Sequence, residues 1–189
     1  MLGKRDCYFT AVSLMLAMAL ALFAVGCSKK EDASEQQARL ALEELLTCTA
    51  QQAEEIDAAM LRMMEEMEAA MEVADGEPGM AQGGTALLDH FTGRFGGLMT
   101  DDCIQAAIAN RDVTRSYDLF QKHQADIKPD PLELSKQEGE KEVYTFSVTL
   151  KTPDGKETAT ATGTITMKET EAGWMAANIT LTVKEPYGR

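Results

Sequence analysis

The chain changes its pattern of apolar and polar positions twice. Residues 9–23 form a nearly continuous apolar stretch. From residue 35 to 125, apolar residues recur every three or four positions, which is the period of helices with one buried face. Over residues 130–186 apolar and polar side chains alternate, as in strands whose sheet is buried on one face. This order predicts an α+β fold, in which N-terminal amphipathic helices pack on a C-terminal antiparallel meander within one domain, residues 35–186.

The helical region is predicted to open with one long helix, or two helices in line, over residues 34–73. The stretch Thr47-Cys48-Thr49 is a weak point in it, because β-branched residues lose side-chain freedom in a helix. A glycine-rich loop follows, and then a short helix over residues 85–94. A further helix begins after Thr100, a natural N-cap, and is interrupted near residues 110–112 before it resumes to residue 124.

The C-terminal region contains three runs with strict alternation, over residues 144–150, 158–167 and 175–183. Threonine occupies most polar positions of the middle run, as is usual on an exposed strand face. Residues 132–136 are expected to add a fourth strand. The prediction is therefore a three- to four-stranded antiparallel meander with one apolar face turned to the helices.

The N-terminus has the three parts of a secretory signal: a basic start, an apolar stretch and a small-residue end. The end is Ala24-Val25-Gly26, directly before Cys27. It resembles the lipobox of bacterial lipoproteins, in which glycine and cysteine hold these last two positions, although leucine is commoner where Ala24 stands. The resemblance implies that the Cys27 thiol is lipidated and that residues 1–26 are removed as a signal peptide. Residues 27–34 then form the lipidated cysteine and a short tether.

An uncleaved transmembrane helix is the competing interpretation, because about twenty apolar residues suffice to span a bilayer. The polar run that begins at Ser28, directly after the cysteine, favours the lipoprotein. Two or more acyl chains such as palmitate anchor a protein stably, since each buried methylene contributes roughly 0.8 kcal/mol. In lipoproteins of this type, aspartate after the lipidated cysteine retains the protein in the inner membrane. Ser28 at that position therefore implies the outer membrane, facing the periplasm.

The formal net charge of −13 limits the possible partners. Residues 31–90 contain fifteen acidic residues against Arg39 and Arg62, so the acidity belongs to the first half of the mature chain. Nucleic acid is excluded as a partner, since proteins bind it by neutralising phosphates with lysine and arginine. A charged partner would be basic, or a cation. The simpler interpretation is a helix face that glutamates keep soluble.

Two cysteines remain once Cys7 is removed with the signal peptide and Cys27 is lipidated. Cys48 and Cys103 are an even pair in an oxidising compartment, and a disulfide between them is the simplest prediction. Two buried free thiols, or a pair of thiol ligands for a metal, are the alternatives. Zinc is disfavoured because no further cysteine or histidine lies at ligand spacing.

The most distinctive candidate for a binding site is a methionine-rich stretch of the first helical segment. Thioethers suit Cu(I), and three- and four-residue spacing would bring the sulfurs to one helix face. The alternative is that these residues extend the buried stripe that begins at Leu42, because methionine is an adaptable core residue. The residues concerned are Met60, Met63, Met64, Met67 and Met71.

Signals for catalysis are missing from the chain. His90 and His123 are single and far apart, and neither has a nucleophile or an orienting acid in a recognisable motif. Adjacent acidic pairs such as Asp101-Asp102 point to different sides of a helix, so capping and solubility explain them. The chain is therefore predicted not to be an enzyme and to need no cofactor.

Helices followed by a meander whose last strand opens with Gly173-Trp174 are similar to NTF2-like lipoproteins. The strand 144–150, the turn 153–155 and the threonine-rich strand carry this similarity. It implies a cone-shaped pocket between helices and sheet, although the long acidic helix departs from the pattern. The sequence thus predicts a lipid-anchored, non-enzymatic envelope module that binds another envelope protein. The alternative is a small-molecule or copper binder, through an NTF2-like pocket or the methionine-rich face.

Overall fold

The computed structural model describes residues 32–73, 85–137 and 142–186, which belong to one compact unit, Asp32–Arg189. The predicted signal peptide and Cys27 lie outside the described residues. Within the described ranges, no helix is both long and apolar enough to span a bilayer. The elements, in chain order, are α2 (Ala33–Leu46), α3 (Ala50–Val73), α4 (Ala86–Phe95), α5 (Asp101–Ala109), the 3₁₀ helix η1 (Asp112–Thr114), α6 (Arg115–His123), β1 (Lys128–Lys136), β2 (Val143–Lys151), β3 (Glu157–Thr170) and β4 (Gly173–Lys184).

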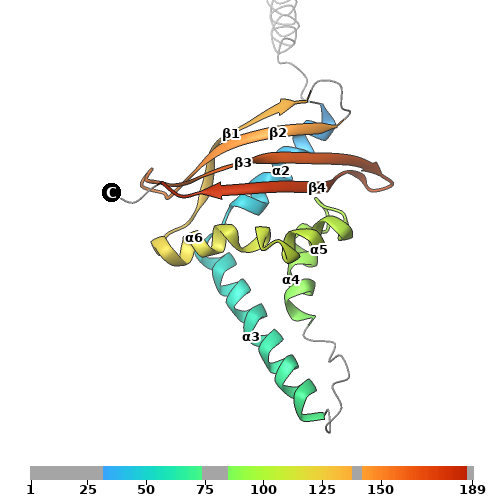
Figure 1. The fold of residues 1–189 in the computed structure, drawn as a ribbon, viewed down its shortest axis with the longest axis vertical. Helices are drawn as coiled ribbons and strands as arrows, with labels where there is room; N and C mark the ends of the chain where they lie inside the picture. Colours follow the sequence, from blue (N-terminus) through green and yellow to red (C-terminus); the bar gives the residue numbers. More distant parts are fainter. Residues whose placement is uncertain (1–31, 74–84, 138–141, 187–189) are drawn as a thin grey trace, which may run out of the picture. The chain divides into compact units, whose positions relative to one another are not determined.

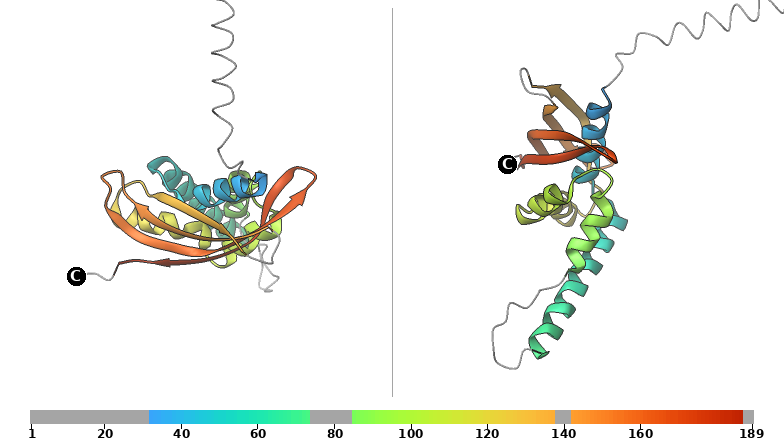
Figure 2. Two further views of the ribbon diagram at one scale, coloured as in Figure 1. Left: turned by 90° about the horizontal axis from the view of Figure 1, so that it is seen from above. Right: turned by 90° about the vertical axis from the view of Figure 1, so that its right-hand side faces the viewer.

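The four strands form an antiparallel meander in the order β1-β2-β3-β4, and the helices precede it in the chain. This is the α+β architecture that the two periodicities predict. The sheet is strongly curved and the helices lie on one side of it (Figure 2). Helix α2 contacts all four strands. The other face carries polar side chains, among them Thr164 and Thr180, whose hydroxyls are hydrogen-bonded across neighbouring strands.

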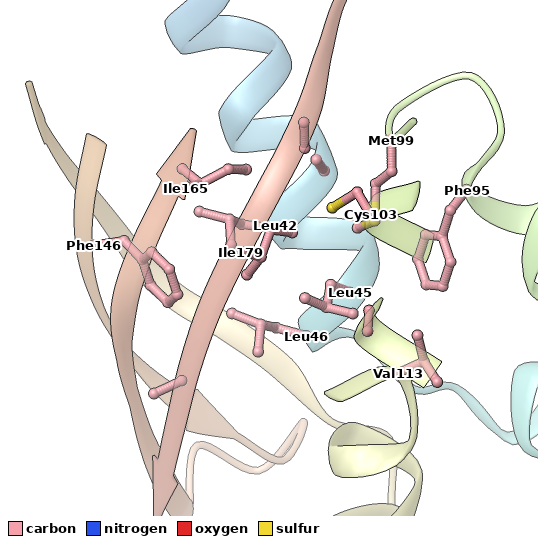
Figure 3. Packing of buried hydrophobic residues seen from close by; sticks show 14 of the residues in the cluster. Leu42, Leu45, Leu46, Phe95, Met99, Cys103, Val113, Phe146, Ile165 and Ile179 are labelled. Carbon is pink, nitrogen blue, oxygen red and sulfur yellow. The ribbon is translucent and has the colours of Figure 1, made fainter. Parts of the chain in front are cut away.

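The core lies between the sheet and the helices, with α2 at its centre. Side chains of α2 are packed between the apolar face of the sheet and the helices α4 to η1 (Figure 3). Complete burial of a leucine side chain contributes roughly 1.5–3 kcal/mol, so this helix is a main source of stability. The residues that meet here include Leu42, Leu45 and Leu46 of α2, Phe146, Ile165 and Ile179 of the sheet, and Phe95, Met99, Cys103 and Val113 of the helical layer.

The predicted weak point at residues 47–49 is the boundary between α2 and α3, where the chain changes direction (Figure 1). The boundary has a specific cause, a capping box. The Gln52 backbone N–H donates to Thr49 Oγ1 at 3.3 Å, and the Thr49 N–H donates to Gln52 Oε1 at 2.9 Å. These two bonds satisfy amides that a helix start leaves without partners. The segment is therefore two helices that are not in line.

Close approach of backbones in the sheet requires the glycine at position 163. A Cβ on Gly163 would lie 1.8 Å from the carbonyl oxygen of Thr180 and 3.0 Å from the ring of Phe146. Gly163 is paired with Phe146 on one side and Leu181 on the other. Because Gly163 has no side chain, the ring of Phe146 can pack directly against the backbone of β3.

Strand β1 begins at Lys128, four residues before the predicted start at Leu132. It contains Pro129 and Pro131, which lie before the predicted strand. β1 is an edge strand, and an edge tolerates proline because one row of its N–H groups has no strand partner. The register shifts between Pro129 and Leu132, so the prolines occupy an irregular part of the ladder.

Candidate functional site

Helix α3 extends beyond the sheet, with α4 beside it (Figures 1 and 2). Its first turns belong to the core, because Ala53, Ile56 and Ala59 are buried. Beyond Met60 the helix is largely exposed. The predicted apolar stripe therefore changes role along one helix, from core packing at the base to a solvent-facing surface.

The base of α3 is held by Arg94 of α4, whose side chain is only 9% exposed. Its guanidinium donates to the Glu44 carboxylate at 2.6 Å, to the Glu44 carbonyl at 2.8 Å and to the Thr47 carbonyl at 3.0 Å. The two carbonyls belong to the end of α2, which leaves such groups without helical partners. Arg94 thus ties α4 to the junction between α2 and α3.

Further hydrogen bonds hold α3 to its neighbours. The Tyr117 hydroxyl of α6 donates to the Asp57 carboxylate, and this bond raises the pKa of the tyrosine. The Ala86 N–H at the start of α4 donates to Glu66 Oε2 at 3.3 Å. Because α4 begins next to Glu66, the described part of α4 lies along the earlier turns of α3. The helix is therefore fixed at its base and along its middle.

An exposed group of apolar side chains lies on this helix pair. Leu61 is 58% exposed, Met64 63%, Met67 39% and Leu88 37%. Glu65, Glu66 and Glu68 are exposed among them on α3. We call Leu61, Met64, Met67 and Leu88, with these three glutamates, the α3 surface. Scattered exposed apolar residues are ordinary. Here three of the four lie between Leu61 and Met67 of one helix, among exposed glutamates.

The predicted methionine site is divided between the core at the base of α3 and the exposed part of the helix. Met60 packs against the core and Met63 is half-buried, whereas Met64 and Met67 are exposed. The side chain of Met71 lies outside the described residues. Residues three and four apart are neighbours on a helix, so the four described methionines share one side of α3. Among the described residues, no group of three or more His, Cys, Asp or Glu side chains could hold a metal ion.

A shallow pocket of about 330 Å³ lies where α2, α3 and α4 meet, lined by Glu55, His90 and Arg94 among others. The Nε2 atom of His90 is buried there and has no hydrogen-bond partner among the described residues. Burial and then the Arg94 charge lower the pKa of His90, so its imidazole is neutral near pH 7. Glu44, the other acid of the pocket, already binds Arg94. This geometry offers no nucleophile for His90 to activate.

The disulfide predicted between Cys48 and Cys103 is not present, and both residues are buried free cysteines. Their surroundings differ. Cys103 is packed in the main core beside Met99 (Figure 3), whereas Cys48 pairs through its backbone with Ile127 at the junction of α2 and α3. Burial raises the pKa of each thiol to about 11. The structure therefore has two buried free thiols, one of the alternatives given above. The spacing of the two cysteines in the sequence could not distinguish this arrangement from a disulfide.

A polar cluster at the start of α2 was not predicted from the sequence. The Ser34 hydroxyl is hydrogen-bonded to the Glu142 carboxylate and lies 2.5 Å from the Tyr144 hydroxyl. Lys136 lies 3.3 Å from the same carboxylate. The bond from Ser34 and the nearby Lys136 lower the pKa of Glu142. Ser34 is completely buried, so the cluster joins the helix to the sheet and has no nucleophile open to a substrate.

The structure therefore defines an α+β domain whose helices cover one face of a four-stranded meander. No family model, no curated protein and no solved structure matches the chain. The function must therefore be argued from the chain's own residues.

Proposed function

We propose that this protein is an envelope lipoprotein, anchored through lipid on Cys27, whose domain is a non-enzymatic docking module. Its partner binds at the α3 surface. The observation that carries the proposal is the exposure of Leu61 and Met64 on a helix that hydrogen bonds from Tyr117 and Ala86 hold to the rest of the domain. A rigid element lowers the entropy cost of binding, because little order has to be gained when the partner arrives.

The chemistry of the surface indicates what it binds. Leucine and methionine side chains gain free energy when a partner removes them from water, and methionine adapts to partners of different shape. Carboxylates beside them select basic partners and speed association. We therefore expect a partner segment with apolar side chains bordered by lysine or arginine.

Charge disfavours a second copy of the same helix at this surface. The sequence of α3 contains seven acidic residues and one basic residue, so two copies face to face would repel each other. These residues are Glu54, Glu55, Asp57, Glu65, Glu66, Glu68 and Glu72, against Arg62.

The amino-acid sequence supports the proposed lipid anchor. Residues 9–23 supply the apolar stretch, Ala24-Val25-Gly26 the small residues, and Cys27 the acyl acceptor. With Ser28 after the cysteine, the proposed site is the outer membrane facing the periplasm. The described domain begins at Asp32, so the tether would keep it within a few nanometres of the bilayer. A partner would accordingly be an envelope protein.

Site-specific photo-crosslinking in intact cells tests the docking surface. A photoreactive amino acid at Met64 should form an adduct with one partner, while the same probe at Ser147, exposed on strand β2, should not. The variant with Glu65→Gln and Glu68→Gln should reduce the Met64 adduct, because the surface loses charge but keeps its apolar residues. An equal pattern of adducts at both positions would contradict the proposal.

The second candidate function is Cu(I) binding by the methionines of α3. Met64 and Met67 are accessible and share one side of the helix with Met60 and Met63, which favours this version over a pocket. Side chains of α2 fill the concave face of the sheet, where an NTF2-like pocket would lie. Titration with Cu(I) under reducing conditions should show binding that the variant with Met64→Leu and Met67→Leu loses. Absence of binding would remove this candidate.

A further inference from the structure

A groove of about 450 Å³ lies between the η1 region and the strands β3 and β4, away from the α3 surface. Its size is in the range of small-molecule sites. Asn110, Asp112 and Arg115 line it on the helical side. Gly163 and Leu181 are among the residues of its other wall.

Asp112 is the unusual residue of this groove. It is only 5% exposed, and among the described residues its carboxylate has no hydrogen bond or ion pair. Burial raises its pKa, with the Arg115 charge acting in the opposite direction. Among the described residues, its oxygens are not counted with the fully buried polar atoms that lack a partner, so the carboxylate is reached by solvent, and by a ligand, from the groove that it lines.

Arg115 lines the same groove from an exposed position. Within the described part of the chain its guanidinium forms no ion pair, with Asp112 or with any other acid. Two opposite charges thus lie at one groove close enough to influence each other, yet they do not pair. A molecule that carries both charges would find an opposite charge for each of them among the residues of this groove.

We propose that this groove binds a small zwitterion of the α-amino acid class, with its ammonium group on Asp112 and its carboxylate on Arg115. The ammonium supplies the hydrogen-bond donors that the Asp112 carboxylate lacks, and a guanidinium can hold a carboxylate through two parallel bonds. Ile179 and Leu181 give the groove an apolar wall, which suits an aliphatic side chain. This activity is separate from docking at α3.

A structural role for Asp112 is the competing explanation. Asp112 lies in the turn before α6, where a negative charge interacts favourably with the helix dipole. That role predicts a stability effect and no ligand. Binding measurements on a matched set of molecules separate the two explanations.

The experiment is calorimetric titration of the detergent-extracted protein with three probes that share the isobutyl side chain of leucine. These are L-leucine with both charges, isoamylamine with the ammonium alone, and 4-methylvalerate with the carboxylate alone. Leucine should bind most tightly, because it alone satisfies both residues. Asp112→Asn should weaken leucine by about 10- to 100-fold, the usual effect of losing a hydrogen bond to a charged group.

Arg115→Gln is the second variant, and it should fold normally because the side chain is exposed. It should weaken leucine and 4-methylvalerate but leave isoamylamine unchanged. Asp112→Asn should instead weaken the binding of leucine and isoamylamine and leave that of 4-methylvalerate unchanged. If no probe binds the natural protein in the millimolar range, or if leucine binds both variants as tightly as it binds the natural protein, the proposal is overturned.

Discussion

Arg94 of α4 donates two hydrogen bonds to Glu44 of α2, one to its carboxylate and one to its backbone carbonyl. The same guanidinium reaches the Thr47 carbonyl, at the end of the helix. One side chain therefore holds together the helix at the centre of the core and the helix beside α3. The position of the proposed docking surface depends on this contact.

Replacing Arg94 with methionine should lower the free energy of unfolding by about 3 kcal/mol, because it leaves a carboxylate and two carbonyls without their partner. Urea denaturation measures the effect. Arg111→Met is the matched control, since Arg111 is 73% exposed and its pair with Asp118 is long, at 3.9 Å. A change of less than about 0.5 kcal/mol is expected there. Equal effects of the two substitutions would show that the Arg94 contacts do not hold the helices.

Gly163→Ala should destabilise the protein by about 3 kcal/mol, because the added methyl would overlap the Thr180 carbonyl. Gly93→Ala provides the comparison: nothing lies within 4 Å of its added Cβ, and the residue is inside α4. Alanine there should raise stability by about 0.5–1 kcal/mol, since glycine is a poor helix former. Thermal unfolding of both variants checks the prediction, which fails if Gly163→Ala unfolds at the temperature of the natural protein.

Because Cys48 and Cys103 are buried thiols, we expect the free energy of unfolding to fall at alkaline pH. Their folded-state pKa of about 11 lies above the ordinary value of 9.0. The thiols of the unfolded chain therefore lose their protons at lower pH than those of the folded chain. The stability that the two protonated thiols contribute is complete below pH 9 and is lost as the pH rises towards 11. The urea midpoint should fall over this interval, and less steeply in the variant with Cys48→Ala and Cys103→Ala.

Thiol labelling gives an independent check of the same claim. A thiol reagent at neutral pH should react slowly with Cys48 and Cys103 in the folded protein and quickly after unfolding, because the reactive thiolate is rare and covered. Rapid labelling of the folded protein would show that the thiols are not buried. Labelling only after reduction would show that they are bonded to each other.

Periodicity predicted most of the fold, since each helix or strand repeats one local pattern over many residues. The alternation in residues 144–150 and the N-cap at Thr100 both correspond to elements of the structure. The boundary between α2 and α3 was visible as Thr49 and Gln52, three residues apart as a capping box requires. β-Branching of Thr47 and Thr49 predicted only a weak point, whereas the capping box accounts for the start of a second helix.

The remaining features depend on contacts between distant residues, which local patterns do not encode. Cys48 and Cys103 form an even pair in the sequence, but their separate packing is a property of the folded chain. Asp112 is an ordinary acidic residue in the sequence, and only the fold shows its burial. The spacing of the methionines was evident, yet only the fold shows that Met60 packs against the core while Met64 and Met67 are exposed.

The central claim is that the chain is exported, lipidated and held at a membrane, since this defines which partners can reach α3. The intact mass of the detergent-extracted protein tests it directly. We predict a mass equal to residues 27–189 plus acyl chains, with the lipid on Cys27. A mass equal to the full 189-residue chain would contradict the claim, because the N-terminal segment would then have been kept without lipid.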